Sequence, residues 1–430
     1  MLKRSIVDKL KKKNFTNLVV YGFGQGFNLL TPLLAVPYIV SKCGIENFGK
    51  TGVGMALSFF LVVIVDFGAD IIGVKEVSVN RDDSKILANI FITTYAAKLL
   101  LTVGLLLILS LLFIYVPYFN REKSMFFLCL PILIGQFINP IWFLQGIEDF
   151  KWITVLNIST KMLYLVGIFI FIKKPADYIF VNLCWGMGMI LPFSFGVLRC
   201  MKTFDLSFRS LIFSNVVKLL KEDYKFCVSQ LFLSMKNYSP MLLIGFFGGF
   251  AVAGQYKIIE QIIMPIRTYL QMIFRFFYPK LCYEIFQSKS QGIAYWKKIN
   301  TINLVIIFGL LTTIFIFSKQ ILGFFKVEQG NVDSMAVVLK YALLIPLFIT
   351  GSFTFEQLLF SIGKRSIYIK VTIVTVILNF TIMFFLFQSY GLYGLITSLL
   401  ITEAIVILCY GIILKTFFKP TPSENERDNS

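Results

Sequence analysis

Residues 236–275 read KNYSPMLLIGFFGGFAVAGQYKIIEQIIMPIRTYLQMIFR, and this stretch decides how the rest of the chain is interpreted. It predicts two apolar helices joined by a short glycine-rich turn, with charged residues placed among Ile, Leu and Phe. Charged side chains inside membrane-length apolar segments are costly, so they usually face a water-filled cavity and mark a transport path. We therefore expect this hairpin to open the second half of a transporter and its charges to line the path.

The composition of the whole chain agrees with a membrane protein. Of the 430 residues, 57% are hydrophobic and 15% are charged, and the mean hydropathy is +0.78. Soluble domains carry about 25% charged residues. The net charge of +18 does not indicate a nucleic-acid partner, because the basic residues lie in short loops and no soluble basic domain is present.

The residue types also restrict the chemistry. The chain has no histidine, which is the commonest general base and metal ligand, so we predict no metal site, no cofactor and no enzymatic activity. The seven cysteines are scattered without a Cys-x-x-Cys pair and are expected to be free thiols.

Apolar length predicts an all-α integral membrane protein with twelve transmembrane helices, in two six-helix lobes around a central cavity. The expected organisation is a basic cytoplasmic N-terminus (1–16), an N-terminal lobe (17–198), a cytoplasmic linker (199–222), a C-terminal lobe (223–414) and a cytoplasmic tail (415–430). The predicted spans are 17–40, 51–74, 86–116, 125–146, 153–172, 178–198, 223–247, 254–278, 299–318, 336–361, 367–388 and 391–414.

The distribution of basic residues predicts the orientation of the chain. With the N-terminus in the cytoplasm, 26 of the 41 Lys and Arg residues fall inside, 8 fall outside and 7 lie within spans. An excess of positive charge in cytoplasmic loops sets the orientation of membrane helices. We therefore expect both termini on the cytoplasmic side.

A weak internal repeat relates the two predicted lobes. Thr31-Pro32 and Gly49 of the first hairpin correspond to Ser239-Pro240 and Gly254 of the second. Parallel repeats of this kind, related by an axis along the membrane normal, occur in several transporter folds. The repeat therefore favours a 6+6 arrangement.

One face of the first span carries Gln25, Asn28 and Pro32, and Pro240 is the repeat counterpart of Pro32. We take these four residues as candidates for polar cavity contacts or for helix bending during gating, with simple helix packing as the alternative. Residues 44–51 match the phosphate-loop pattern G-x-x-x-x-G-K-[ST]. That loop needs a strand before it and a cytoplasmic location, so the match is rejected.

The eighth span presents a polar stripe at helical spacing, which includes Lys257, Glu260 and Arg267. One interpretation is a structural ion pair, for example between Arg267 and Glu356 or Glu403. The functional interpretation is a cationic wall for an anionic substrate. The candidate substrate contacts are Arg267, Lys236, Lys257, Lys98 and Lys161, and the candidate ion-coupling residues are Glu260, Asp66, Glu356 and Glu403.

Three motifs carry a family resemblance. Residues 41–49 (SKCGIENFG) look like the turn after the first span of polysaccharide flippases, and Asp66-Phe67-Gly68 resembles their DFG element. Residues 139–151 (NPIWFLQGIEDFK) are similar to their P-x-W-[FY]-x-Q-G-x-E pattern. The chain thus resembles the O-antigen or capsule repeat-unit flippases of the multidrug/oligosaccharidyl-lipid/polysaccharide superfamily.

The resemblance implies a function and its partners. The substrate would be an oligosaccharide on undecaprenyl diphosphate, moved from the cytoplasmic to the outer leaflet of a bacterial inner membrane by alternating access. H⁺ or Na⁺ would be the coupling ion. Membrane lipids, and a polymerase and chain-length regulator of the same pathway, would be further partners.

Other functions stay open from the sequence. A multidrug and toxin extruder of the same fold moves cations, which the excess of basic residues within the spans disfavours. A membrane glycosyltransferase or polymerase needs a larger loop than any predicted here, and a pore is a further alternative.

Overall fold

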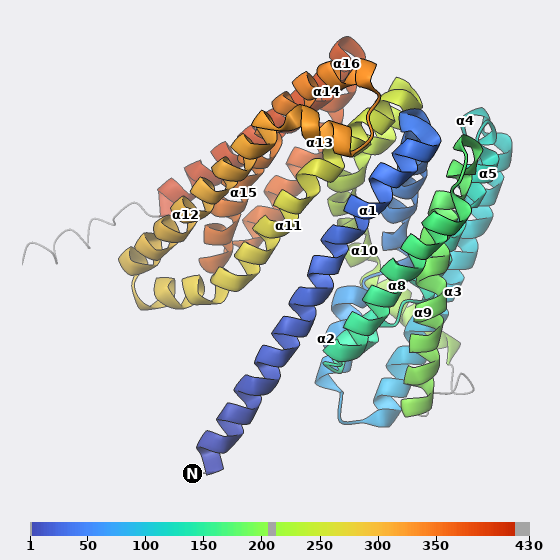
Figure 1. The fold of residues 1–430 in the computed structure, drawn as a ribbon. Coiled ribbons are helices and arrows are strands. Elements are labelled where there is room, and N and C mark those ends of the chain that lie inside the picture. The colour runs from blue at the N-terminus through green and yellow to red at the C-terminus, as the bar shows by residue number, and fades with distance from the viewer. Residues whose placement is uncertain (1, 205–211, 418–430) are drawn as a thin grey trace, which may run out of the picture. The chain divides into compact units, whose positions relative to one another are not determined.

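The computed structural model describes residues 2–204 and 212–417, and within these ranges the chain is helical and contains no strand. It divides into two compact units, Met1–Lys257 and Ile258–Ser430 (Figure 1). The first unit therefore includes residues 223–257, which we expected to begin the second lobe. The lobe boundaries given above remain a prediction.

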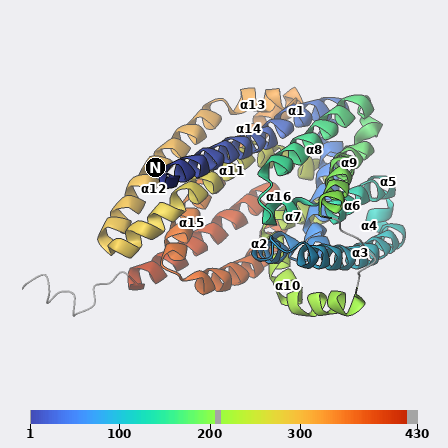
Figure 2. The ribbon, with the colours of Figure 1, turned by 90° about the horizontal axis from the view of Figure 1, so that it is seen from below.

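The first unit is built from long helices joined by short turns. Its elements are α1 (Leu2–Asp66), η1 (Ala69–Gly73), α2 (Val74–Val79), α3 (Ser84–Tyr115), α4 (Pro117–Asn120), α5 (Lys123–Phe127), α6 (Leu130–Ile138), α7 (Ile141–Gly146), α8 (Phe150–Phe171), η2 (Pro175–Ile179), α9 (Phe180–Thr203), α10 (Phe213–Leu243), η4 (Ile244–Gly248) and the beginning of α11 (Gly249–Gln287). Helices α8 and α9 lie side by side, as Figures 1 and 2 show.

The second unit contains the remainder of α11 and five further helices. These are α12 (Lys289–Ile316), α13 (Ser318–Phe324), α14 (Gln329–Ala342), α15 (Leu344–Ser361) and α16 (Arg365–Phe417). Its core includes a cluster in which Leu358 and Leu359 of α15 pack with Val406 and Tyr410 of α16.

Nine helical stretches among the described residues are long and apolar enough to cross a membrane. Three of them contain a glycine with non-helical backbone angles, which are Gly44 (φ 78°), Gly249 (φ 80°) and Gly391 (φ 55°). A positive φ is easily adopted only by glycine, so each of these residues lets a long helix bend sharply. Each one separates two predicted spans, which is consistent with twelve crossings.

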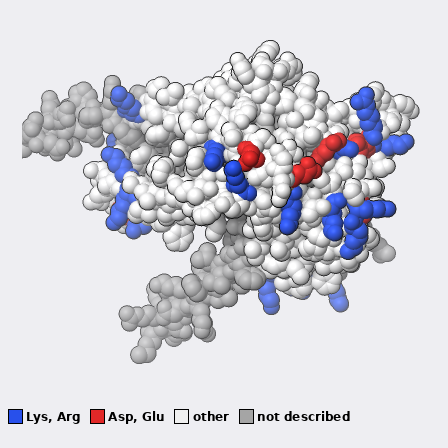
Figure 3. Space-filling view, turned by 45° about the horizontal axis from the view of Figure 1, so that its top comes forward, with Lys and Arg blue, Asp and Glu red and all other residues white. Residues whose placement is uncertain are grey.

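The surfaces of these helices suit a lipid environment. On α3, Leu100, Val103 and Leu107 are exposed, whereas Lys98 and Thr102 on the opposite face are buried. On the face drawn in Figure 3, wide areas carry no charge, and Lys and Arg gather in separate groups. An apolar exterior with polar groups turned inward is the arrangement expected of helices in a bilayer. The chain is thus a multi-pass membrane protein.

The two glycines that we aligned as repeat partners touch each other's backbone within the first unit. A Cβ on Gly49 would lie 1.9 Å from the Phe250 carbonyl oxygen, and a Cβ on Gly254 would lie 2.0 Å from the Ile45 carbonyl oxygen. Ile45 and Phe250 each directly follow a bent glycine, Gly44 or Gly249. The two contacts are reciprocal, because Gly49 meets the residue after Gly249 and Gly254 meets the residue after Gly44. Reciprocal contacts of this kind indicate a local two-fold relationship between the two hairpins, which supports the repeat.

The rejected phosphate-loop match lies within α1, and residues 45–51 are helical. Lys50 forms an ion pair with Glu122 at 2.7 Å, and both side chains are largely buried. The lysine is therefore engaged in holding α1 against the α4–α5 region. All seven cysteines are free, as expected.

The glycine contact gives a first prediction. Gly49→Ala or Gly254→Ala should lower the free energy of unfolding by about 1–3 kcal/mol, because a backbone oxygen occupies the space of the new methyl group. Thermal unfolding of the detergent-purified protein would measure the loss. Gly104→Ala on α3 is the matched control, since a Cβ there meets no atom within 4 Å. Equal stability of all three variants would contradict the close contact.

Candidate functional site

The Asp66-Phe67-Gly68 motif ends α1 and turns the chain into η1. Phe67 and Gly68 both have positive φ angles, of 47° and 85°. Glycine accepts this conformation easily, and here the space beside it is also limited, since a Cβ on Gly68 would lie 2.9 Å from the Phe226 ring. The turn leaves the Asp66 carboxylate at the end of α1, where three donors meet it.

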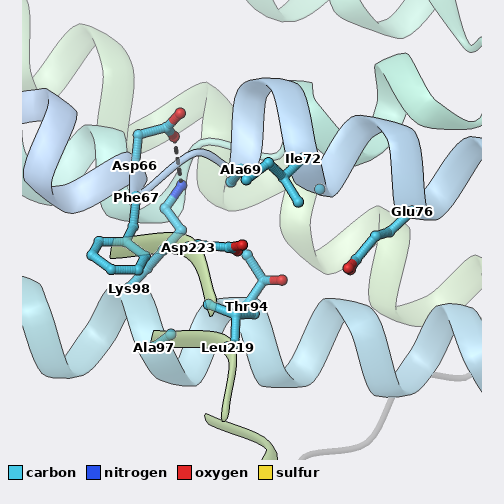
Figure 4. Close-up of a pocket in the computed structure, with 11 residues that line it drawn as sticks. Asp66, Phe67, Ala69, Ile72, Glu76, Thr94, Ala97, Lys98, Leu219 and Asp223 are labelled. Carbon is cyan, nitrogen blue, oxygen red and sulfur yellow. Dashed lines mark hydrogen bonds and ion pairs between the residues drawn. The ribbon is translucent and has the colours of Figure 1, made fainter. Parts of the chain in front are cut away.

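The Asp66 carboxylate is the centre of a buried polar site. Lys98 Nζ lies 3.2 Å from its Oδ1 (Figure 4). The Gln136 side-chain amide donates to the same oxygen at 3.0 Å. The backbone N–H of Asp70 donates to Oδ2 at 3.2 Å. The Lys98 side chain is only 1% exposed. An ammonium so deeply buried needs a charged partner, which the Asp66 carboxylate provides.

A second layer of hydrogen bonds holds Gln136 in place. Asn139 Nδ2 donates to Gln136 Oε1 at 3.3 Å, and the Ile141 backbone N–H donates to Asn139 Oδ1 at 3.0 Å. The Asn139-Pro140 step between α6 and α7 thus connects the NPIWFLQG motif to Asp66. We did not predict Gln136 as a site residue. Its position one helical turn before Asn139 was the available signal.

The tryptophan of the same motif fixes the elements around Asp66. A Cβ on Gly73 would lie 3.0 Å from the Trp142 ring, so this ring packs directly against η1. The Phe143 ring meets Phe91 of α3 edge-on at 5.1 Å. Gly146 also packs closely against α2, since a Cβ on Gly146 would lie 2.5 Å from a methyl carbon of Val77. Apolar packing of this kind gives the polar site a rigid frame.

The site opens into a pocket whose charges are mainly acidic. Its lining includes Asp66 and Lys98, Glu76 of α2, and Leu219 and Asp223 of α10 (Figure 4). Partial burial and the neighbouring carboxylates of Asp223 and Glu222 raise the pKa of Glu76. Such a pocket attracts cations and protons rather than phosphate.

This geometry changes the interpretation of Lys98. We predicted Lys98 as a contact for an anionic substrate and Asp66 as a separate coupling candidate. The structure joins them in one ion pair inside an acidic pocket. The Lys98 ammonium is therefore largely neutralised, and the pair fits ion coupling better than anion binding.

Lys161 is placed differently. Its Nζ lies 3.8 Å from the centre of the Trp185 ring, and the described residues provide no carboxylate partner for it. Lys236 is exposed on α10. The side-chain stem of Lys257 lies against α1, since a Cβ on Gly52 would be 3.3 Å from Lys257 Cγ.

Among the four polar or gating candidates, the structure describes two side chains. Pro32 is half-buried in α1 and Pro240 is buried in α10. The side chains of Gln25 and Asn28 lie outside the described residues.

Four of the candidates lie in the second unit, on α11, α15 and α16. Arg267 is half-buried on α11, and its Nε is buried without a hydrogen-bond partner in the described part of the chain. Glu403 of α16 is buried and accepts a 2.6 Å hydrogen bond from the Ser352 hydroxyl. Glu260 and Glu356 are half-buried. The structural alternative, Arg267 paired with Glu356 or Glu403, is not among the ion pairs of the described residues.

Comparison with solved structures identifies the fold. The structure is similar to an inward-facing multidrug resistance transporter of the MATE family in the MOP superfamily, with a TM-score of 0.70, 16% identity, and coverage of 90% of this chain and 95% of that one. It is equally similar to the lipid II flippase MurJ in an inward closed conformation, with a TM-score of 0.70, 13% identity, and coverage of 93% and 87%. The fold is therefore that of these membrane transporters.

The family follows from the sequence comparison. Residues 15–282, more than half of the chain, match the family of polysaccharide biosynthesis proteins, and the chain belongs to this family. A protein of Escherichia coli (strain K12) named "Putative O-antigen transporter" is 24% identical over 91% of this chain and 94% of its own length. A protein of Shigella dysenteriae with the same name is 23% identical over 91% and 98%. These relatives are named as transporters, and the family resemblance noted in the sequence is confirmed.

The buried ion pair gives the second prediction. Asp66→Asn should reduce the free energy of unfolding by about 3–5 kcal/mol, because it leaves the buried Lys98 ammonium without a counter-charge. The double variant Asp66→Asn/Lys98→Met should recover most of this loss in thermal unfolding. Asp333→Asn, which breaks the exposed pair with Lys319, is the control and should change stability by less than about 1 kcal/mol. A double variant less stable than Asp66→Asn alone would contradict the account.

Proposed function

We propose that this protein is a flippase that moves oligosaccharide repeat units linked to undecaprenyl diphosphate, for O-antigen or capsule assembly. Transport would run from the cytoplasmic to the outer leaflet of a bacterial inner membrane. The observation that carries the proposal is the near full-length similarity to two proteins named as O-antigen transporters. The fold shared with a lipid II flippase supports it.

Such a protein must move a polar head group through the hydrocarbon core of the bilayer. Sugars and a diphosphate cannot enter hydrocarbon without losing their hydration, which costs many kcal/mol. A water-filled path lined by cations would replace that hydration by charge-assisted hydrogen bonds. Lys161 and Arg267 support this, because neither has a carboxylate partner among the described residues. Lys236 and Lys257 are the further proposed contacts.

We assign ion coupling to the Asp66 site in preference to Glu260, Glu356 or Glu403. Binding of H⁺ or Na⁺ to the Asp66 carboxylate would weaken its attraction to Lys98 and alter the contacts among α1, α3 and α6. The neighbouring groups are Asp70, Glu76 and Asp223, all carboxylates, which would concentrate cations at the pocket. Glu403, which accepts a hydrogen bond from the Ser352 hydroxyl, is the alternative coupling candidate on α16.

The proposed arrangement in the membrane follows the charge pattern. Both termini would be cytoplasmic, with six-helix lobes at 17–198 and 223–414 that alternate between inward and outward access. A polymerase and a chain-length regulator of the same pathway are the proposed protein partners.

The second candidate function is that of a multidrug and toxin extruder-type cation antiporter. The acidic pocket around Asp66 favours this alternative, as does the shared fold with a multidrug transporter. The two functions differ in an observable way, because an extruder would confer drug resistance without affecting surface polysaccharide.

The cationic path gives the third prediction. Arg267→Gln and Lys236→Gln, tested separately, should each reduce surface polysaccharide at least several-fold, because each removes one charge-assisted contact to the anionic head group. Export is measured in a strain that lacks its own flippase. Lys319→Gln, in an exposed ion pair, is the control and should export normally. Full export by both path variants at normal protein level would contradict the proposal.

The coupling site gives the fourth prediction. In proteoliposomes, Asp66→Asn/Lys98→Met should flip substrate at a rate that a pH or Na⁺ gradient no longer increases, because no titratable pair remains. The matched variant Lys319→Gln/Asp333→Asn should keep the response of the wild type. A gradient response that survives in the first variant would assign coupling to another site.

A further inference from the structure

A row of four aromatic rings crosses four helices of the first unit. The Tyr164 ring of α8 meets Trp185 of α9 edge-on at 4.8 Å. Trp185 meets Phe59 of α1 edge-on at 5.8 Å, and Phe59 stacks with Tyr238 of α10 at 6.1 Å. Phe59, Trp185 and Tyr238 are only partly buried, and Phe59 and Trp185 pack at the edge of the buried cluster that contains Phe91 and Trp142.

The lysine beside this row faces the interior of the protein and not the lipid. On α8, Lys161 shares its face with Tyr164 and Ile168, which are buried. The opposite face carries Val166 and Ile170, which are exposed. Since side chains three, four and seven residues apart lie on one helix face, the Lys161 ammonium points inward. It lies 3.8 Å from the centre of the Trp185 ring, which accounts for one favourable contact but leaves its charge unneutralised.

The indole N–H of Trp185 is a second polar group without a hydrogen-bond partner in the described part of the chain, and it is buried. On α9, Trp185 shares its face with Val181 and Met189, which are buried, so it too points inward. A buried donor left without an acceptor is destabilising, and folded proteins rarely keep one without a reason.

We propose that Lys161, Trp185, Phe59 and Tyr238 form the subsite for the glycosyl-diphosphate junction of a lipid-linked saccharide. The Lys161 ammonium and the Trp185 N–H are donors for the phosphate oxygens. The Phe59 and Tyr238 rings give the first sugar an apolar surface for its C–H face. This chemistry does not fit an organic cation, which the lysine would repel. The inference rests on the proposed function, which it makes more specific by naming the part of the substrate that is recognised.

The site is distinct from the Asp66 pocket in its chemistry. The described surroundings of Lys161 are aromatic, whereas Lys98 lies among carboxylates. Two buried lysines of the same lobe thus have different assignments, one to substrate and one to coupling.

The test is a binding measurement on the full chain in nanodiscs with two probes. One is farnesyl diphosphate, and the other is the same molecule carrying one N-acetylglucosamine. Lys161→Gln should weaken both probes roughly tenfold or more, because it removes a charged hydrogen-bond donor. Lys161→Arg should stay within about threefold of the wild type. Phe59→Leu and Tyr238→Leu should weaken only the glycosylated probe.

A matched control and the opposing outcomes complete the test. Lys340 of α14 also lies over an aromatic ring, Phe315, at 4.7 Å, so Lys340→Gln changes an equivalent contact elsewhere and should bind both probes normally. If the wild type binds the probes and folded Lys161→Gln binds them equally well, the subsite is wrong. If Phe59→Leu and Tyr238→Leu bind the glycosylated probe as tightly as the wild type does, the two rings do not contact the sugar and that part of the proposal is wrong. A wild type that binds neither probe would overturn the proposed substrate class itself.

Discussion

The ion pair between Asp66 and Lys98 is the interaction on which the described site depends. A lysine that is 1% exposed within an apolar helix is tolerable only beside a counter-charge, and Asp66 is held in position to provide it. The left-handed turn at Phe67 and Gly68, the Gln136–Asn139 hydrogen bonds and the packing of Trp142 on Gly73 all contribute to this position. Two of the three motifs that carry the family resemblance, DFG and NPIWFLQG, therefore meet at one carboxylate at the end of α1.

A second constraint is the close approach of two helices at Gly49 and Gly254. The reciprocal contacts with Phe250 and Ile45 leave no room for side chains at either glycine. The two hairpins that meet here are alike in backbone shape, down to the angles at Gly44 and Gly249, and unlike in charge.

Much of the fold followed from the sequence, because apolar length and glycine position are local properties. The predicted spans fall on the observed helices, and the DFG and NPIWFLQG motifs led to the right family. The pairing of Asp66 with Lys98 could not be predicted from the sequence. The two residues are 32 positions apart, and no helical spacing brings residues so far apart together. Charge alone made Lys98 and Lys161 look equivalent. Only their neighbours, carboxylates for Lys98 and an indole ring for Lys161, distinguish the roles that we propose for them.

The central claim is that the protein moves a lipid-linked oligosaccharide across a bilayer. The most direct measurement uses purified protein in proteoliposomes with fluorescently labelled undecaprenyl-diphosphate oligosaccharide, and follows how much label a membrane-impermeant quencher reaches over time. The account predicts that the protein exposes the inner-leaflet label many times faster than empty liposomes do, while a labelled phospholipid stays in place. Equal rates for both lipids, or no acceleration over empty liposomes, would contradict it.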